Sequence, residues 1–195
     1  MLRIITLLSL CVATGFTPLG LRPTTHTLEA SSSIKVHGTS TLHDWTMVMK
    51  QASGEATFEM NETGLTISRV FISLNAEDLK SEYALMDKNA YEALKTEKFP
   101  KITFDLSQVH GITHSGSAYQ VDASGLVSMA GAMKTVRMTV VCHVGKDGTI
   151  QITGKKAMKM TDFGIEPPEV MFGTITTGDD IVIDFDARFL PNGHS

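Results

Sequence analysis

Two histidines are spaced so that their side chains could bind one metal ion. His110 and His114 form an H-x-x-x-H pair, which can hold zinc when both side chains lie on one face of a helix. Here the pair flanks Gly111 in a stretch of turn residues, and the Glu of the H-E-x-x-H motif is absent. The sequence therefore predicts no metal site at these histidines.

Catalytic patterns are equally sparse. Ser40, His43 and Asp44 have the residue types of a hydrolase triad, but they crowd one short hairpin, and the chain has no G-x-S-x-G motif. Cys142 lies among alternating apolar residues, where a free cysteine is typically a small buried hydrophobe rather than a nucleophile. We therefore expect a protein that is not an enzyme and has no catalytic residue and no cofactor.

Three lysines could bind an anion. Lys155, Lys156 and Lys159 could contact a diphosphate at the mouth of a binding site, although such a run more commonly forms a solvated face. The segment "GTIQITGKK" (148–156) resembles a phosphate loop, but five residues separate its glycines and no Ser or Thr follows the Lys. No head-group contact is assigned from the sequence.

The segments that must position any site are mostly strands, and turn signals separate them. Asp147-Gly148 is the clearest hairpin turn. The segment around Ser68 keeps its apolar residues on one face only if a β-bulge lies there. Strand patterns cover 33–40, 45–51, 55–60, 65–74, 101–109, 118–129, 135–144, 149–160 and 180–189.

Two of these segments alternate strictly between apolar and polar residues. In 136–144 the apolar face begins at Val136 and ends at Val144, and in 181–189 it begins at Ile181 and ends at Phe189. One apolar and one polar face per strand is typical of an antiparallel sheet that closes around an apolar interior. The charged outer faces exclude a membrane-spanning barrel, whose outer surface would be apolar. We expect an all-β fold, an antiparallel β-barrel of about eight strands, with a β-sandwich as the alternative.

One helix interrupts the strands. In 84–95, Met86, Ala90 and Leu94 repeat at four-residue spacing, and Asp87 can cap the first turn. The alternating residues after Pro100 then predict the next strand. This short helix is a crossover between two strands, and we expect it to cover one end of the barrel.

The inward faces of the predicted strands are rich in aromatic and flexible side chains, and the chain has 11 Met. Flexible methionines and aromatic rings suit a cavity that holds a floppy apolar chain, although plain core packing gives the same pattern. The residues predicted to line the cavity are Trp45, Met47, Phe58, Phe104, Met138, Val140, Phe185, Ala187 and Phe189.

Length and charge limit the remaining possibilities. The 195 residues predict one domain, at 33–195, preceded by a polar segment at 16–32. The net charge is −4 and the basic residues are scattered, which excludes a nucleic-acid partner. Residues 1–15 resemble a secretory signal peptide, with an apolar stretch too short to span a bilayer, so we predict export to the periplasm or beyond. The alternative is a lipoprotein signal with lipidation at Cys11.

Four blocks, in this order, resemble the YceI-like family of exported polyisoprenoid-binding proteins. They are "GTSTLHDWTM" (38–47), "MDKNAYEALKTEKFPKITFDL" (86–106), "GLVSMAGAMKTVRMTV" (125–140) and "MKMTDFGIEPPEVMFGTITTGDDIVIDFDARF" (158–189). Many family members carry an Arg-Asp pair and a His before the helix, where this chain has "LKSEYALMD", so no role of those residues carries over.

This resemblance implies a lipocalin-like barrel that holds a long-chain isoprenoid or fatty lipid. It also implies a periplasmic or secreted protein without enzymatic activity. The alternative function is that of an exported structural or stress-related interaction protein with a solidly packed barrel and no ligand.

Overall fold

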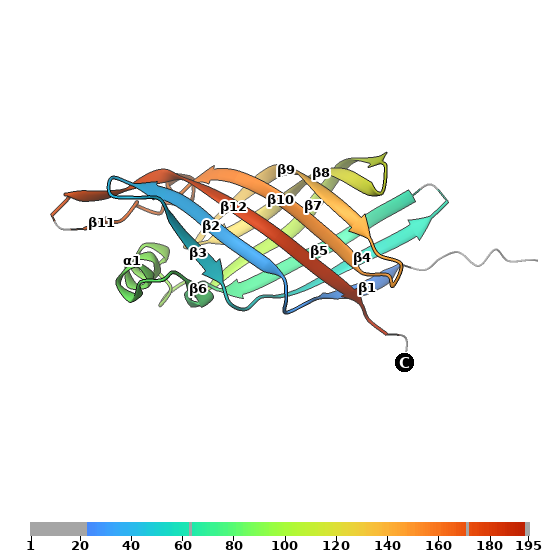
Figure 1. The fold of residues 1–195 in the computed structure, drawn as a ribbon, viewed down its shortest axis with the longest axis horizontal. Helices are drawn as coiled ribbons and strands as arrows, with labels where there is room; N and C mark the ends of the chain where they lie inside the picture. Colours follow the sequence, from blue (N-terminus) through green and yellow to red (C-terminus); the bar gives the residue numbers. More distant parts are fainter. Residues whose placement is uncertain (1–22, 63, 171, 194–195) are drawn as a thin grey trace, which may run out of the picture.

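The barrel is a closed ring of antiparallel strands, seen in the computed structural model of residues 23–62, 64–170 and 172–193 (Figure 1). The last strand pairs with the first and so closes the ring. The predicted all-β, eight-stranded antiparallel barrel is confirmed, and the sandwich alternative is wrong. In ring order the strands are β1 (Thr24–Leu28), β4 (Ser53–Asn61), β5 (Gly64–Asn75), β7 (Lys101–Ser115), β8 (Ala118–Met129), β9 (Ala132–Val144), β10 (Ile150–Lys159) and β12 (Ile175–Pro191).

A second run of strands extends the wall at one end of the barrel. The long strand β12 pairs with β1 through its last residues and with β2 (Ser33–Ser40) through residues between Thr177 and Asp186. Beyond β2 lie β3 (Trp45–Met49) and the short β6 (Leu79–Lys80), while β11 (Glu169–Val170) pairs with the start of β12. Two 3-10 turns, η1 (Ala76–Asp78) and η2 (Thr161–Phe163), complete the order.

Strand β1 was not predicted, because it lies in the segment taken as polar. Its residues run TTHTL, and only His26 and Leu28 are buried. His26 is 4% exposed, and its two ring nitrogens each lie 3.0 Å from a carbonyl oxygen, of Thr24 and of Gly148. A histidine thus occupies a core position, and the domain begins earlier than residue 33. The predicted signal peptide at 1–15 and Cys11 lie outside the described residues.

The alternation of the two clearest strands is confirmed. Val136, Val140 and Cys142 of β9 are buried, as are Ile181 and Phe189 of β12. The turn between β9 and β10 is the predicted one: the Gly145 amide donates to Thr149 O at 2.7 Å, within a short hairpin.

The bulge near Ser68 is also confirmed. Thr57 of β4 pairs with Arg69 of β5, and Phe58 pairs with Ile67, so Ser68 is the extra residue. This insertion lets Ile67 and Val70 both face the interior, where both are buried.

Strand β7 is longer than predicted. It continues through Ser115 and turns at Gly116, which has a φ of +61°. Two register shifts against β8 adjust the pairing in this stretch. His110 and His114 therefore lie on a strand rather than in a loop.

Helix α1 (Ala84–Leu94) lies at the end of the barrel opposite β1 (Figure 1). The predicted cap is wrong: Tyr83 is the N-cap residue, and no side chain caps the helix. Asp87 instead accepts hydrogen bonds from the backbone N–H and the hydroxyl of Ser81, both at 2.7 Å. Within the described ranges, no helix is long and apolar enough to cross a membrane.

Candidate functional site: an apolar cavity in the barrel

The barrel encloses a cavity of about 590 Å³. This volume lies within the range of roughly 300–1,000 Å³ that is typical of small-molecule sites. Side chains from β2, β3, β5, β7, β8, β9, β10, β12 and α1 line it, and nearly all of them are apolar. No Asp or Glu of the described chain is among them.

Aromatic side chains close one end of the cavity. The rings of Phe189 and Phe58 meet edge to face with their centroids 5.8 Å apart, and His26 packs against Phe58 in the same way at 5.0 Å. Phe189 lines the cavity, whereas Phe58 lies behind it and does not. Beyond Phe189 the barrel is filled by a core that includes Ala56 and Cys142, so this end is a floor.

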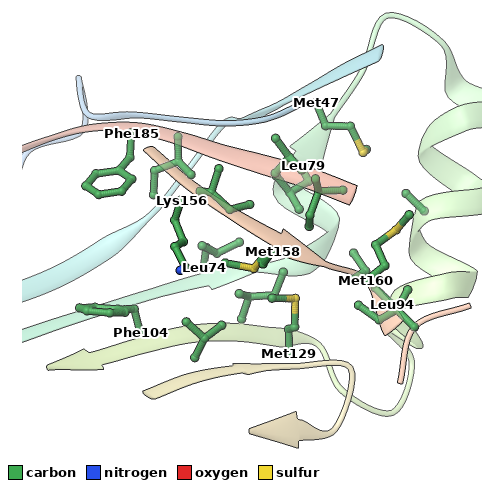
Figure 2. Close-up of a pocket in the computed structure, with 18 of the residues that line it drawn as sticks. Met47, Leu74, Leu79, Leu94, Phe104, Met129, Lys156, Met158, Met160 and Phe185 are labelled. Carbon is green, nitrogen blue, oxygen red and sulfur yellow. The ribbon is translucent and has the colours of Figure 1, made fainter. Parts of the chain in front are cut away.

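The other end opens to solvent beside the helix. Leu42, Tyr83 and Leu85 line the cavity and are 66%, 61% and 68% exposed, so the space reaches the surface there. Ala90 and Leu94 of α1 also line it, and Leu94 is seen at the helix edge of the cavity in Figure 2. The predicted placement of the helix over one barrel end is confirmed.

A hydrogen-bonded tyrosine fastens the helix to the barrel. The Lys80 ammonium donates to the Tyr91 hydroxyl at 2.6 Å, and that hydroxyl lies 2.9 Å from the Leu79 carbonyl oxygen. The hydrogen bond from Lys80 to Tyr91 raises the pKa of Lys80. The Thr96 hydroxyl also donates to Glu77 at 2.9 Å. These contacts hold α1 next to η1 and β6, at the mouth of the cavity.

Eight of the nine residues predicted as lining do face the cavity. They are Trp45, Met47, Phe104, Met138, Val140, Phe185, Ala187 and Phe189; only Phe58 is placed elsewhere. Strand alternation gave the inward direction of Phe58, which is 2% exposed, but alternation says nothing about where along the barrel the empty space ends.

Three aromatic rings of the lining lie over glycines of a neighbouring strand. A Cβ at Gly154 would come within 2.8 Å of Cζ of Phe185, and Gly125 and Gly38 are covered in the same way by Phe104 and Trp45. Because these glycines have no side chain, the rings can lie close to the wall. This arrangement leaves the middle of the barrel open.

Methionines concentrate in the half of the cavity nearer the helix. Met47 of β3, Met129 of β8, Met158 of β10 and Met160, directly after β10, extend into this region (Figure 2), and Met86 of α1 joins them. Methionine has three rotatable bonds and a polarisable sulfur, so it adapts to ligands of irregular shape. The mouth of the cavity is therefore its most adaptable part.

The three predicted lysines do not share one environment. Lys155 pairs with Asp184 at 2.8 Å, and Lys159 pairs with Asp180 at 3.1 Å, both on the outer surface. Lys156 instead lines the cavity. The solvated-face interpretation is thus wrong for Lys156. The signal that places Lys156 inside is the alternation along β10, where it follows Ile150, Ile152 and Gly154 and precedes Met158.

The candidate metal and catalytic residues contact partners other than those of a metal site or a catalytic triad. His110 Nε2 lies 2.7 Å from the Ser124 hydroxyl, while the His114 ring stacks on Tyr119 at 4.6 Å. No cluster of metal-ligating side chains occurs in the described part of the chain. The Ser40 hydroxyl donates to the backbone carbonyl of His43, not to its ring.

Cys142 is fully buried, and this burial raises the pKa of its thiol to about 12. At neutral pH the side chain is an uncharged thiol, which is a poor nucleophile and a poor metal ligand. It serves as a core residue, as its position in the strand pattern predicted.

Solved structures share this fold at low sequence identity. BcnA from Burkholderia cenocepacia is 15% identical with a TM-score of 0.65, and the match covers 82% of this chain and 96% of that one. A polyisoprenoid-binding domain from Saccharophagus degradans is 12% identical with a TM-score of 0.68, covering 88% and 100%. The YCEI protein of Campylobacter jejuni is 15% identical with a TM-score of 0.57, covering 99% and 100%.

Sequence comparison gives a family rather than a characterised relative. Among curated proteins, no sequence is similar enough to this chain to count as a match. The model of the YceI-like domain matches residues 25–189, a range that runs from β1, which closes the barrel, to Phe189, which forms the floor of the cavity. The chain therefore belongs to the YceI-like family.

Proposed function

We propose that this protein binds a long apolar molecule, a polyisoprenoid or a similar lipid, inside its barrel. The observation that carries the proposal is the cavity itself: it is apolar, closed at Phe189 and open beside α1. The polyisoprenoid-binding domain from Saccharophagus degradans, which has the same fold, supports this ligand class. The alternative is a structural or interaction protein with a solidly packed barrel, and such a barrel would not contain a cavity of about 590 Å³.

The apolar lining is sufficient to bind such a chain. One isoprene unit has five carbons, and burying it contributes at most roughly 3–4 kcal/mol. Micromolar affinity needs about 8 kcal/mol after association costs of about 4–15 kcal/mol. The burial of several units therefore supplies enough free energy for micromolar affinity without any polar contact.

We also propose that the protein is exported and works in the periplasm or outside the cell. The support is the basic and then apolar start of the chain at 1–15 and membership of the YceI-like family, for which the sequence resemblance implies export. Intact-mass measurement on protein recovered from its native host tests this. A mass for all 195 residues would contradict export, and a diacyl addition on Cys11 would identify a lipoprotein.

Lipid extraction tests the binding proposal. Protein purified without detergent is extracted with organic solvent, and the extract is analysed by mass spectrometry for a long-chain lipid at near-stoichiometric amount. A cavity-filling variant, Ala187→Phe, directs a ring from the inward face of β12 into the space above Phe189 and should recover much less lipid. Val182→Phe, on the outer face of the same strand, is the matched control and should recover as much as wild type. If no lipid is extracted and none binds on addition, the proposal fails.

A further inference from the structure

One lysine points into the apolar cavity. Lys156 lies in the middle of β10, and Figure 2 shows its side chain extending into the space between Phe185 on one wall and Phe104 on the other. Its inward neighbours along the strand are Gly154 and Met158, and its cross-strand partner is Ile183. The half-buried side chain of Lys156 thus lies among apolar side chains.

The cavity supplies no counter-charge to this ammonium. No Asp or Glu of the described ranges lines the cavity, and Lys156 has no ion pair or hydrogen bond with any described residue. The flanking Lys155 and Lys159 both have acidic partners, but these lie on the outer surface. Since a cation in apolar surroundings is costly unless it is paired, the partner that suits Lys156 is an anion brought by the ligand.

We propose that Lys156 binds the carboxylate of an acidic lipid, such as a fatty acid or an isoprenoid acid, held in the cavity. This inference rests on the proposed lipid-binding function and narrows its ligand class. One ammonium can neutralise one carboxylate in a charge-assisted hydrogen bond. A diphosphate carries more negative charge than a single lysine can balance, and no second basic residue of the described chain lines the cavity except His43 at its rim.

The position of Lys156 along the barrel orients the ligand. Phe189 at the floor lies six residues from Ile183, the partner of Lys156, and six residues of strand span about 20 Å at roughly 3.3 Å each. This deeper section is lined by apolar residues such as Val121, Val140 and Ala187. A ligand that enters tail first therefore places its tail toward Phe189 and its carboxylate at Lys156.

Matched ligands test the proposal. Oleic acid and oleyl alcohol have the same tail and differ in the head group, and each is titrated below its aggregation limit into delipidated full-length protein by displacement of a fluorescent lipid. Wild type should bind the acid about tenfold or more tighter than the alcohol, as expected for a charge-assisted hydrogen bond. Lys156→Met, a neutral residue of similar length, should lose this preference and bind the alcohol at least as well as wild type.

Two further variants are the controls. Lys156→Arg keeps the charge and should retain the preference for the acid. Lys155→Met removes the adjacent lysine from the outer face and should behave as wild type, because an exposed ion pair contributes little.

The outcomes separate this inference from the function on which it rests. If acid and alcohol bind wild type equally well, or Lys156→Met keeps the preference, the ammonium is merely hydrated through the open end and the inference is wrong. If neither ligand binds wild type, the lipid-binding function itself fails. The wild-type comparison alone decides between these outcomes even if a variant does not fold.

Discussion

Gly154 of β10 and Phe185 of β12 are register partners, and the Phe185 ring occupies the space that a side chain at position 154 would need. A Cβ there would lie 2.8 Å from Cζ of the ring and 3.1 Å from Cγ1 of Val140. The glycine therefore lets the ring lie close to the wall of the barrel. The width of the cavity at this level depends on the absence of one methyl group.

Replacing this glycine should narrow the cavity. In Gly154→Ala the Phe185 ring has to move toward the middle of the barrel, so we expect lipid affinity to fall several-fold. We also expect the free energy of unfolding to fall by about 1–3 kcal/mol, because the added methyl group overpacks this site. Lipid titration and thermal unfolding of the delipidated protein measure the two effects. Ala157→Val, which adds bulk to the exposed face of the same strand, should leave lipid affinity unchanged. Unchanged affinity in Gly154→Ala would show that Phe185 does not limit the space.

The tyrosine that fastens α1 should control exchange of the ligand. Tyr91→Phe removes the hydroxyl that receives the Lys80 hydrogen bond and lies 2.9 Å from the Leu79 carbonyl. We expect a loss of about 1 kcal/mol in stability, the usual contribution of such a hydrogen bond. Because the helix lies at the open end, lipid should also dissociate faster. Hydrogen exchange should increase in 84–94 but not in β9, and equal exchange in both proteins would contradict the role of Tyr91.

Cys142 should be unreactive in the folded protein. In a Cys11→Ser background, a thiol reagent at pH 8 should label Cys142 only after unfolding, because the thiol is buried and its pKa is raised to about 12. Rapid labelling under native conditions would contradict the buried position.

The same pKa predicts a fall in stability at alkaline pH. Above about pH 8.5 the thiol ionises in the unfolded chain but stays protonated in the folded one, so unfolding releases a proton and stability decreases with rising pH until about 12. The slope approaches about 1.4 kcal/mol per pH unit. Cys142→Ala should lack this component of the decrease, and an identical alkaline profile in both proteins would rule it out.

An exposed ion pair links β8 and β9. Arg137 donates to both carboxylate oxygens of Asp122, at 3.0 and 2.6 Å, and these hydrogen bonds lower the pKa of Asp122. A lowered folded-state pKa means that this stabilisation is complete above the unfolded pKa of about 3.9 and is lost as the pH falls further. In Arg137→Gln the pKa of Asp122 should rise toward its ordinary value, as NMR titration of the carboxyl carbon can show. Thr139→Ser, nearby on the same face of β9, should leave that pKa unchanged.

The wall of the barrel could be predicted wherever hydrophobic alternation is strict. In β9 and β12 each strand has one wet and one dry face, so the period of two gave the inward residues correctly. Strand β1 was not predicted because a histidine occupies one of its two buried positions. A hydrophobicity pattern does not identify a buried histidine whose ring nitrogens lie next to carbonyl oxygens.

The candidate site could be predicted only in part. The inward direction follows from alternation, and eight of the nine predicted residues face the cavity; the depth along the barrel does not follow from alternation, so Phe58 was included. Lys156 was missed because its neighbours Lys155 and Lys159 gave the segment the composition of a solvated face. Only the position of each lysine in the alternation separates the one inside from the two outside.

The contacts among His26, Phe58 and Phe189 close the barrel at one end, so the depth of the cavity limits the length of lipid tail that it can hold. Each carbon added to a bound tail gains contact with the wall until the tip reaches Phe189. Every carbon beyond that point must remain in water at the open end beside α1. In a homologous series of lipids, affinity should therefore climb with chain length and then level off, and the length at the break would report how far the floor lies from the mouth.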